Sequence, residues 1–129
     1  DLTQYTMAAD RLLGDLAHLN NPWQPAVLKM IKMTVEGAQR ASVTAGKKKY
    51  VSVCGEAAAD PALAVVLIGL GVDTLSMNAG AIPAVAAVLK SVTKEKAQQI
   101  AAIALQQISS AEAKESARKA LPILDELGL

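Results

Sequence analysis

Cys54 is the only cysteine in the chain, and it lies where the apolar run Val51-Ser-Val-Cys-Gly-Glu56 ends in a thiol, a glycine and a carboxylate. The valines favour a strand and Gly55 allows a sharp turn, and parallel α/β folds place reactive groups at the carboxyl ends of strands. A thiol in this position could act as a nucleophile or as an acid. On residue type alone, however, a lone cysteine is more often an inert small side chain in the core.

Composition excludes several classes of function. A single cysteine cannot form an internal disulfide, and no partner stands at a metal-ligand spacing from it, which fits a reducing, cytoplasmic compartment. The net charge of +1 predicts no nucleic-acid partner, because proteins that bind phosphate backbones concentrate basic residues. The run Lys47-Lys-Lys49 is typical of a solvated loop. The apolar stretch 63–72 contains two glycines and is about half the length of a membrane span, so no membrane partner is expected.

The chain must provide elements that position such a thiol. Its 129 residues are 52% hydrophobic, which predicts one globular unit over residues 1–129. Helical spacing of apolar residues predicts a helix over 26–45, with Met30 on its apolar face, and a strand follows over 49–54. Asp60 and Pro61 are an N-cap and first-turn proline for a helix to Ile68, and 72–77 favours a second strand.

The remainder of the chain is predicted to be helical. Pro83 begins a helix to about residue 92, Thr93 caps another over 94–107, and Ser109 with Glu112 has the spacing of a capping box for a last helix, which Pro122 must kink or end. Strands and helices alternate over 49–92, which predicts a helix-rich α/β fold with parallel strands. Such a pattern fits either a barrel segment or part of an open sheet.

Four segments together resemble one family. They are Asp1-Leu-Thr-Gln-Tyr-Thr-Met-Ala-Ala-Asp-Arg11, Val51-Ser-Val-Cys-Gly-Glu56, Asp60-Pro-Ala-Leu63 and Leu75-Ser-Met-Asn-Ala-Gly-Ala-Ile-Pro83. In this order they resemble the last part of the phosphoenolpyruvate-binding domain of enzyme I, the phosphoenolpyruvate-protein phosphotransferase of the bacterial sugar phosphotransferase system. Pyruvate phosphate dikinase and phosphoenolpyruvate synthase share the Cys-Gly-Glu signature, but the residues of the first segment resemble those of enzyme I.

The resemblance implies a fold and a context. The fold is the closing, C-terminal part of a (β/α)₈ TIM barrel: the end of the sixth strand, the seventh and eighth strands, and their helices. Because the chain starts at Asp1 within a motif and has no initiator Met, we expect it to be a piece of a longer protein.

The resemblance also implies roles for three residues. Cys54 would be the general acid that protonates the enolate of pyruvate after phosphoenolpyruvate has given its phosphoryl group to a histidine on another domain. A thiol suits this role because it ordinarily keeps its proton at neutral pH. Glu56 could help to keep the thiol protonated, or could simply anchor the turn.

Asp1 would bind Mg²⁺ and Arg11 would contact the phosphate, so both would contribute to substrate binding. Carboxylate oxygens suit a hard cation, and a guanidinium offers paired donors to phosphate oxygens. Without the resemblance, Asp1 would be an ordinary terminal residue and Asp10-Arg11 a charged helix start.

The chain departs from the family pattern at several positions. Leu12 and Ala59 stand where enzyme I usually has glycine, and Asn78 and Ala81 stand where it usually has serine. If the two glycines have special dihedral angles in the family, the loops near Arg11 and Cys54 would differ here.

The implied function belongs to a longer protein. It would transfer phosphate from phosphoenolpyruvate to its own histidine and on to the carrier protein HPr, releasing pyruvate, and it would be a homodimer. The segment alone is expected to be inactive, because the phosphohistidine, the second Mg²⁺ carboxylate and further arginines lie outside it. The alternatives are a non-catalytic helical dimerisation fragment, or the equivalent piece of the dikinase or the synthase.

Overall fold

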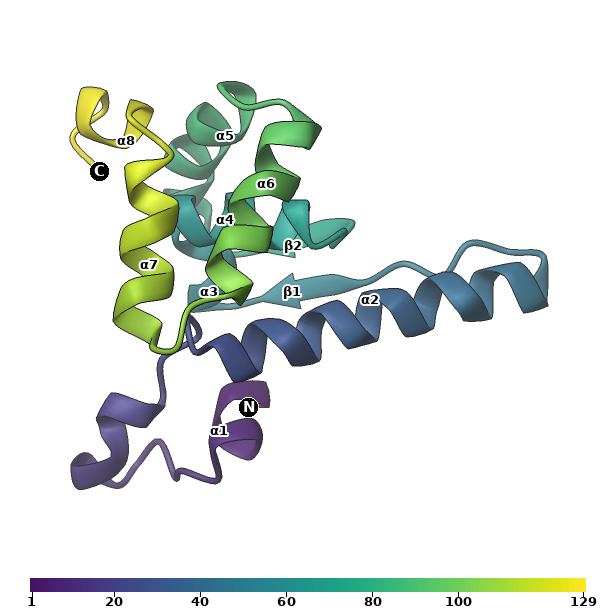
Figure 1. Cartoon of the computed structure of the whole chain (residues 1–129), viewed down its shortest axis with the longest axis horizontal. Coiled ribbons are helices and arrows are strands. Elements are labelled where there is room, and N and C mark those ends of the chain that lie inside the picture. Colours follow the sequence, from purple (N-terminus) through teal and green to yellow (C-terminus); the bar gives the residue numbers. More distant parts are fainter.

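The computed structural model describes all 129 residues and consists mainly of helices around one short sheet (Figure 1). Its helical and strand elements, in chain order, are α1 (Leu2–Met7), η1 (Gly14–Leu19), α2 (Pro25–Ala45), β1 (Ser52–Cys54), α3 (Glu56–Ala59), α4 (Pro61–Gly69), β2 (Thr74–Ser76), η2 (Ala79–Ala81), α5 (Ile82–Lys90), α6 (Lys94–Leu105), α7 (Ser110–Lys119) and α8 (Ile123–Glu126). The expected helix-rich α/β class is therefore confirmed.

The two strands are parallel, as the alternation of elements predicts, with Val53 opposite Leu75 and Cys54 opposite Ser76. Each strand is only three residues long and therefore shorter than predicted. Directly before β1, the Asp73 carboxylate accepts a hydrogen bond from the Val51 backbone N–H at 3.0 Å. A side chain, and not a backbone carbonyl, is thus the acceptor for this N–H group. The strand predicted over 72–77 is confirmed only over Thr74–Ser76, and the side chain of Asp73 caps β1 instead.

The sheet has one covered and one uncovered face. Val53 and Leu75 are partly buried and pack against the hydrophobic core. The alternate positions on the two strands are exposed: Ser52, Cys54, Thr74 and Ser76. Side chains alternate between the two faces of a strand, so the face that carries Cys54 is open to solvent.

Helix α4 is the centre of the core. Every residue from Ala62 to Leu67 is buried, because α3, α5, α6 and α7 all pack against this helix. A helix that is apolar on every side must be covered on every side, and Figure 1 shows α6 in front of α4, with α5 and α7 next to it. The Asp60 carboxylate caps its N-terminus by accepting from the backbone N–H groups of Ala62 and Leu63.

Helix α2 closes the core from the other side and confirms the helix predicted over 26–45. Val27, Leu28, Ile31 and Val35 are buried, and Gly46 ends the helix with a φ of 61°. Met30, which was predicted on the apolar face, is 41% exposed. The C-terminal half of α2 extends beyond the other helices (Figure 1), and no residue of this helix after Val35 is buried. Apolar spacing alone therefore did not predict which residues of the helix are covered.

The caps predicted after residue 83 are confirmed. The Thr93 hydroxyl accepts from the Lys96 N–H at 3.2 Å, and the Ser109 hydroxyl accepts from the Glu112 N–H at 3.2 Å. The Glu112 carboxylate accepts from the N–H of Ile108 rather than from that of Ser109. Pro122 separates α7 from α8.

Four short elements, α1, η1, α3 and η2, were not predicted. None exceeds six residues, and a segment this short is stabilised by its tertiary surroundings rather than by its own periodicity. None of the helices has both the length and the apolar character that crossing a membrane requires.

The Lys48–Asp73 pair predicts a pH dependence of stability. The Lys48 ammonium, 2.6 Å from the carboxylate, and then the Val51 N–H lower the pKa of Asp73 below its ordinary value, whereas the same hydrogen bond raises the pKa of Lys48. Asp73 therefore contributes stability that is present above about pH 4 and is lost as the pH falls further, and Lys48 contributes stability that is lost only above about pH 10.

We expect the free energy of unfolding of the Asp73→Asn variant to decline less steeply than that of the wild type below about pH 4. Urea titrations at a series of pH values would measure this slope. Asp15→Asn, which removes a carboxylate that forms no ion pair, is the matched control and should retain the wild-type slope. Equal slopes for Asp73→Asn and wild type would contradict the assignment.

Candidate active site

The residues singled out from the sequence line one hollow at the carboxyl end of β1. This hollow has a volume of about 540 Å³, and its lining residues are Asp1, Thr3, Gln4, Arg11, Asn20, Pro22, Cys54, Gly55, Glu56 and Ala57. Asp1, Arg11 and Cys54 are thus brought to one place from two separate segments of the chain. The volume lies within the usual range for small-molecule sites.

Cys54 is the last residue of β1 and is exposed. The following residue, Gly55, has φ 88° and ψ −153°, a conformation that is essentially restricted to glycine. The Gly55 N–H donates to the Ser76 carbonyl at 2.9 Å and so continues the ladder past the thiol. The backbone on both sides of Cys54 is thereby fixed, and the thiol remains accessible to water and to a ligand.

Asp1 and Arg11 form an ion pair, with 3.2 Å between Arg11 Nη1 and Asp1 Oδ1. Their side chains are 73% and 62% exposed, respectively. An ion pair this exposed contributes little to stability, so a ligand can replace it at little cost. A phosphate would offer Arg11 a geometry in which two N–H groups donate in parallel.

The Arg11 loop turns back over α1. Helix α1 ends at Ala8, which has φ 51° and ψ 37°, a left-handed conformation that is uncommon outside glycine. The Arg11 N–H then donates to Gln4 Oε1 at 3.3 Å. This turn brings residue 11 back to residue 1, which explains how the two ends of the first motif meet.

The departures from the family pattern leave the backbone unstrained. Neither Leu12 nor Ala59 has a positive φ, so neither position requires glycine. Asn78 accepts a hydrogen bond from the Ala81 N–H at 3.0 Å and caps η2.

The site residues include some that sequence reasoning missed. Gln4 and Asn20 line the hollow, and Asn20 Nδ2 donates to the Ala9 carbonyl at 3.0 Å. Gln4 could have been predicted as a site residue because it belongs to the first motif, whereas nothing in the sequence around Asn20 indicated a role in the site. His18 is exposed and lies outside the hollow, with its Nδ1 3.1 Å from the Asp15 carbonyl.

Two carboxylates at the hollow could contribute to a magnesium site. No group of three or more Asp, Glu, His or Cys residues is close enough to enclose a metal ion. Asp1 and Glu56 nevertheless place carboxylates at the hollow. Protein-bound Mg²⁺ commonly takes only one or two carboxylates, with water and substrate phosphate completing the shell. The residues therefore fit a partial metal site, for which Asp1 could supply one ligand.

Comparison with known proteins identifies the family. Residues 1–94, which include the whole hollow, match the family described as "PEP-utilising enzyme, PEP-binding domain", where PEP is phosphoenolpyruvate. The chain belongs to this family of PEP-binding domains. The expected resemblance is thereby confirmed at the level of the domain.

Relatives of this PEP-binding domain carry more specific names. The chain is 45% identical over 121 residues to a phosphoenolpyruvate-protein phosphotransferase of Streptomyces coelicolor, covering 94% of this chain and 21% of the relative. It is 36% identical over 112 residues to the phosphoenolpyruvate-protein phosphotransferase of Haemophilus influenzae, covering 87% of this chain and 18% of the relative. Identity to a multiphosphoryl transfer protein of Xanthomonas campestris is 44% over 106 residues, or 82% of this chain and 12% of the relative. The chain thus spans about a fifth or less of the length of these proteins.

Proposed function

We propose that this chain is part of a phosphoenolpyruvate-protein phosphotransferase and forms one side of its phosphoenolpyruvate pocket. The observation that carries the proposal is the shared hollow: an arginine, a carboxylate and a thiol from separate segments meet at the end of a strand. The names of the relatives support it. The full-length phosphotransferase that would contain this segment is called the parent protein below.

In this proposal Arg11 binds the phosphate of phosphoenolpyruvate and Cys54 supplies a proton. The bond between phosphorus and the enol oxygen breaks as a bond to a histidine nitrogen forms on another part of the parent protein. The electron pair left on the enolate takes the proton from Cys54 Sγ at its terminal carbon, which yields pyruvate and a thiolate. Because Cys54 is exposed, water can return the proton after pyruvate leaves.

Asp1 would supply a carboxylate ligand to Mg²⁺. The bound ion would add positive charge to the site of the phosphate. Arg11 is already paired with Asp1, so binding of substrate and metal would exchange that ion pair for two new charge-assisted contacts.

The sheet supports the further proposal that this segment belongs to a TIM barrel. Its two strands are parallel, their reactive ends face one way, and the face that carries Cys54 is uncovered. Barrel strands have neighbours on both edges and side chains inside, which two strands alone lack. In the parent protein, preceding strands would pair with the free edges of this sheet and close the barrel, so that this face would lie inside it. Transfer from the phosphohistidine to HPr would occur elsewhere.

Arg11→Lys in the parent protein tests the proposal. We expect KM for phosphoenolpyruvate to rise about tenfold, because lysine keeps the charge but cannot present two coplanar donors. Arg40→Lys on α2 makes the same change away from the hollow and should leave KM unaltered. Wild-type KM in Arg11→Lys would remove Arg11 from the phosphate site.

A further inference from the structure

One side-chain hydrogen bond joins the Arg11 loop to the Cys54 loop, and a second one holds the Arg11 loop together. The chain from Ala9 to Trp23 carries Arg11, and the chain from Cys54 to Asp60 carries the thiol. Asn20 Nδ2 donates to the Ala9 carbonyl at 3.0 Å, and Trp23 Nε1 donates to Asp60 Oδ2 at 3.0 Å. Trp23 and Asp60 are 37 residues apart in the sequence.

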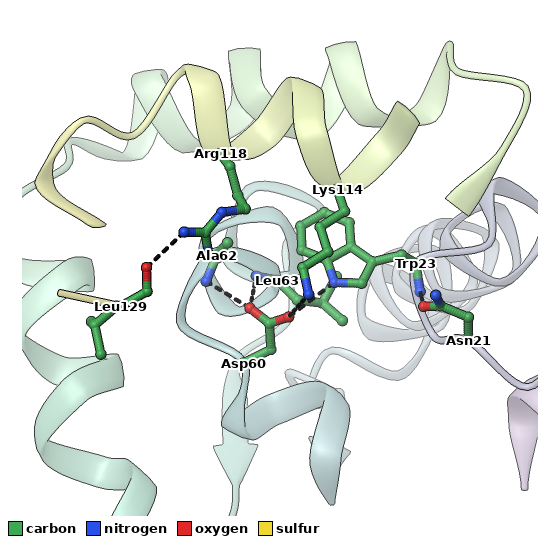
Figure 2. A network of polar contacts seen from close by, with 8 residues as sticks. All are labelled: Asn21, Trp23, Asp60, Ala62, Leu63, Lys114, Arg118 and Leu129. Atoms are coloured by element: carbon green, nitrogen blue, oxygen red, sulfur yellow. Dashed lines mark hydrogen bonds and ion pairs between the residues drawn. The ribbon is translucent and has the colours of Figure 1, made fainter. Parts of the chain in front are cut away.

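The Asp60 end of this connection is fixed to α4. Asp60 Oδ1 accepts from the N–H groups of Ala62 and Leu63 at 3.0 and 3.2 Å, which leaves Oδ2 for Trp23. Figure 2 shows the Lys114 ammonium approaching the same oxygen from α7, at 3.9 Å. The Asp60 N–H also donates to the Glu56 carbonyl, so the carboxylate is tied to the turn that follows Cys54.

The Trp23 end is fixed in the core. Its side chain is 2% exposed, and its backbone N–H donates to Asn21 Oδ1 at 3.0 Å (Figure 2). Asn20, three residues earlier in the chain, holds the carbonyl of Ala9, which is itself 1% exposed. Ala9 is two residues from Arg11. The indole N–H is therefore the only polar group of a buried ring, and it is directed at the cap of α4 rather than at solvent.

We infer that Trp23 and Asp60 are positioning residues, whose hydrogen bond sets the place of Arg11 relative to Cys54. This inference rests on the proposed function, because it concerns the two groups assigned there to the phosphate and to the enolate. Neither Trp23 nor Asp60 lines the hollow, so neither touches the substrate.

The two loops should respond unequally when this connection is lost. The Cys54 loop is held independently by the Gly55–Ser76 backbone bond of 2.9 Å. No other hydrogen bond joins the Arg11 loop to the Cys54 loop, and Arg11 itself is held only by the bond from its backbone N–H to Gln4 and by an exposed ion pair. Arg11 should therefore be the group that is displaced. Because Arg11 binds the phosphate in both the ground state and the transition state, its displacement raises KM more than it lowers kcat.

Trp23→Phe in the parent protein tests the inference, since phenylalanine keeps an aromatic ring but removes the N–H donor together with part of the buried ring volume. KM for phosphoenolpyruvate should rise about 3- to 10-fold with kcat changed less than twofold. Asp60→Asn keeps an oxygen for the cap of α4 but replaces the acceptor of the indole N–H with an amide nitrogen. This variant should likewise raise KM and leave kcat nearly unchanged. The double variant should have a KM no higher than that of the worse single variant, because both changes remove one bond.

Two controls separate positioning from stability. Lys114→Gln removes the ion pair to Asp60 but leaves the indole bond, and should keep the wild-type KM. Val88→Ala destabilises the same core away from these contacts and should lower the urea midpoint without raising KM. A wild-type KM in Trp23→Phe, or multiplied effects in the double variant, would overturn the inference while Arg11→Lys still tested the proposed function. If Arg11→Lys leaves KM unchanged and Cys54→Ala leaves kcat unchanged, the proposed function fails, and the inference fails with it.

Discussion

Replacing Cys54 with alanine in the parent protein should slow pyruvate formation by roughly 10² to 10⁴. A general acid acts in the transition state, so its loss lowers kcat and leaves the binding of phosphoenolpyruvate almost unchanged. The structure favours this outcome because Cys54 is exposed at the hollow and the backbone next to it is fixed by Gly55. Rapid-quench measurement of pyruvate, together with calorimetric titration of phosphoenolpyruvate, would separate the two effects.

Ser52→Ala is the matched control for this experiment. Ser52 lies on the same strand and the same exposed face as Cys54 but outside the hollow, so its loss should change neither rate nor affinity. Pyruvate formation at the wild-type rate in Cys54→Ala would exclude the thiol from the mechanism. A loss of affinity as large as the loss of rate would instead assign Cys54 to substrate binding.

Replacing Gly69 with alanine should destabilise this chain by about 3 kcal/mol or more, the upper end of what overpacking costs. Gly69 ends α4 where α6 crosses it, and an added Cβ would overlap the backbone carbonyl of Ala97 and lie 2.9 Å from the Cβ of Ala101. Backbone atoms cannot rotate away, so the two helices would have to separate. Because α4 and α6 form the centre of the core, the whole unit should unfold at lower urea concentration.

Gly37→Ala is a control that should change stability in the opposite direction. Gly37 lies within α2, and the nearest atom to an added Cβ is Arg40 Nη2, at 3.9 Å. Alanine there should stabilise the chain by about 0.5–1 kcal/mol, since glycine disfavours a helix interior. Urea midpoints measured on both variants would test the pair. An unchanged midpoint in Gly69→Ala would mean that α4 and α6 are farther apart than the structure places them.

Local signals in the sequence were sufficient for the longer elements. Asp60 and Pro61 located the start of α4, Gly46 located the end of α2, and Thr93 and Ser109 located two further caps, because each signal is a hydrogen bond or a dihedral preference within a few residues. The strands were predicted to be longer than they are, because valine content does not reveal where the hydrogen-bond ladder ends. That end depends on Asp73, which is 22 residues from the N–H group that it caps.

The site was predictable only in part for the same reason. The identities of Asp1, Arg11 and Cys54 came from the resemblance to a family. Their meeting at one hollow depends on the left-handed turn at Ala8 and on the contacts of Asn20, neither of which has a sequence signature. Long-range contacts such as Trp23 with Asp60 were likewise invisible in the chain, because neither residue type specifies its partner.

The most direct test of the central claim is whether phosphoenolpyruvate occupies the hollow beside Cys54. Cys54 is the only cysteine in this chain and it is exposed, so the rate of its alkylation by iodoacetamide can be followed by mass spectrometry of the peptide that contains it. In the parent protein, phosphoenolpyruvate with Mg²⁺ should slow this alkylation at least tenfold, an estimate based on near-complete occupancy of the site. The protection should weaken in Arg11→Lys. Equal alkylation rates with and without saturating phosphoenolpyruvate would contradict the account.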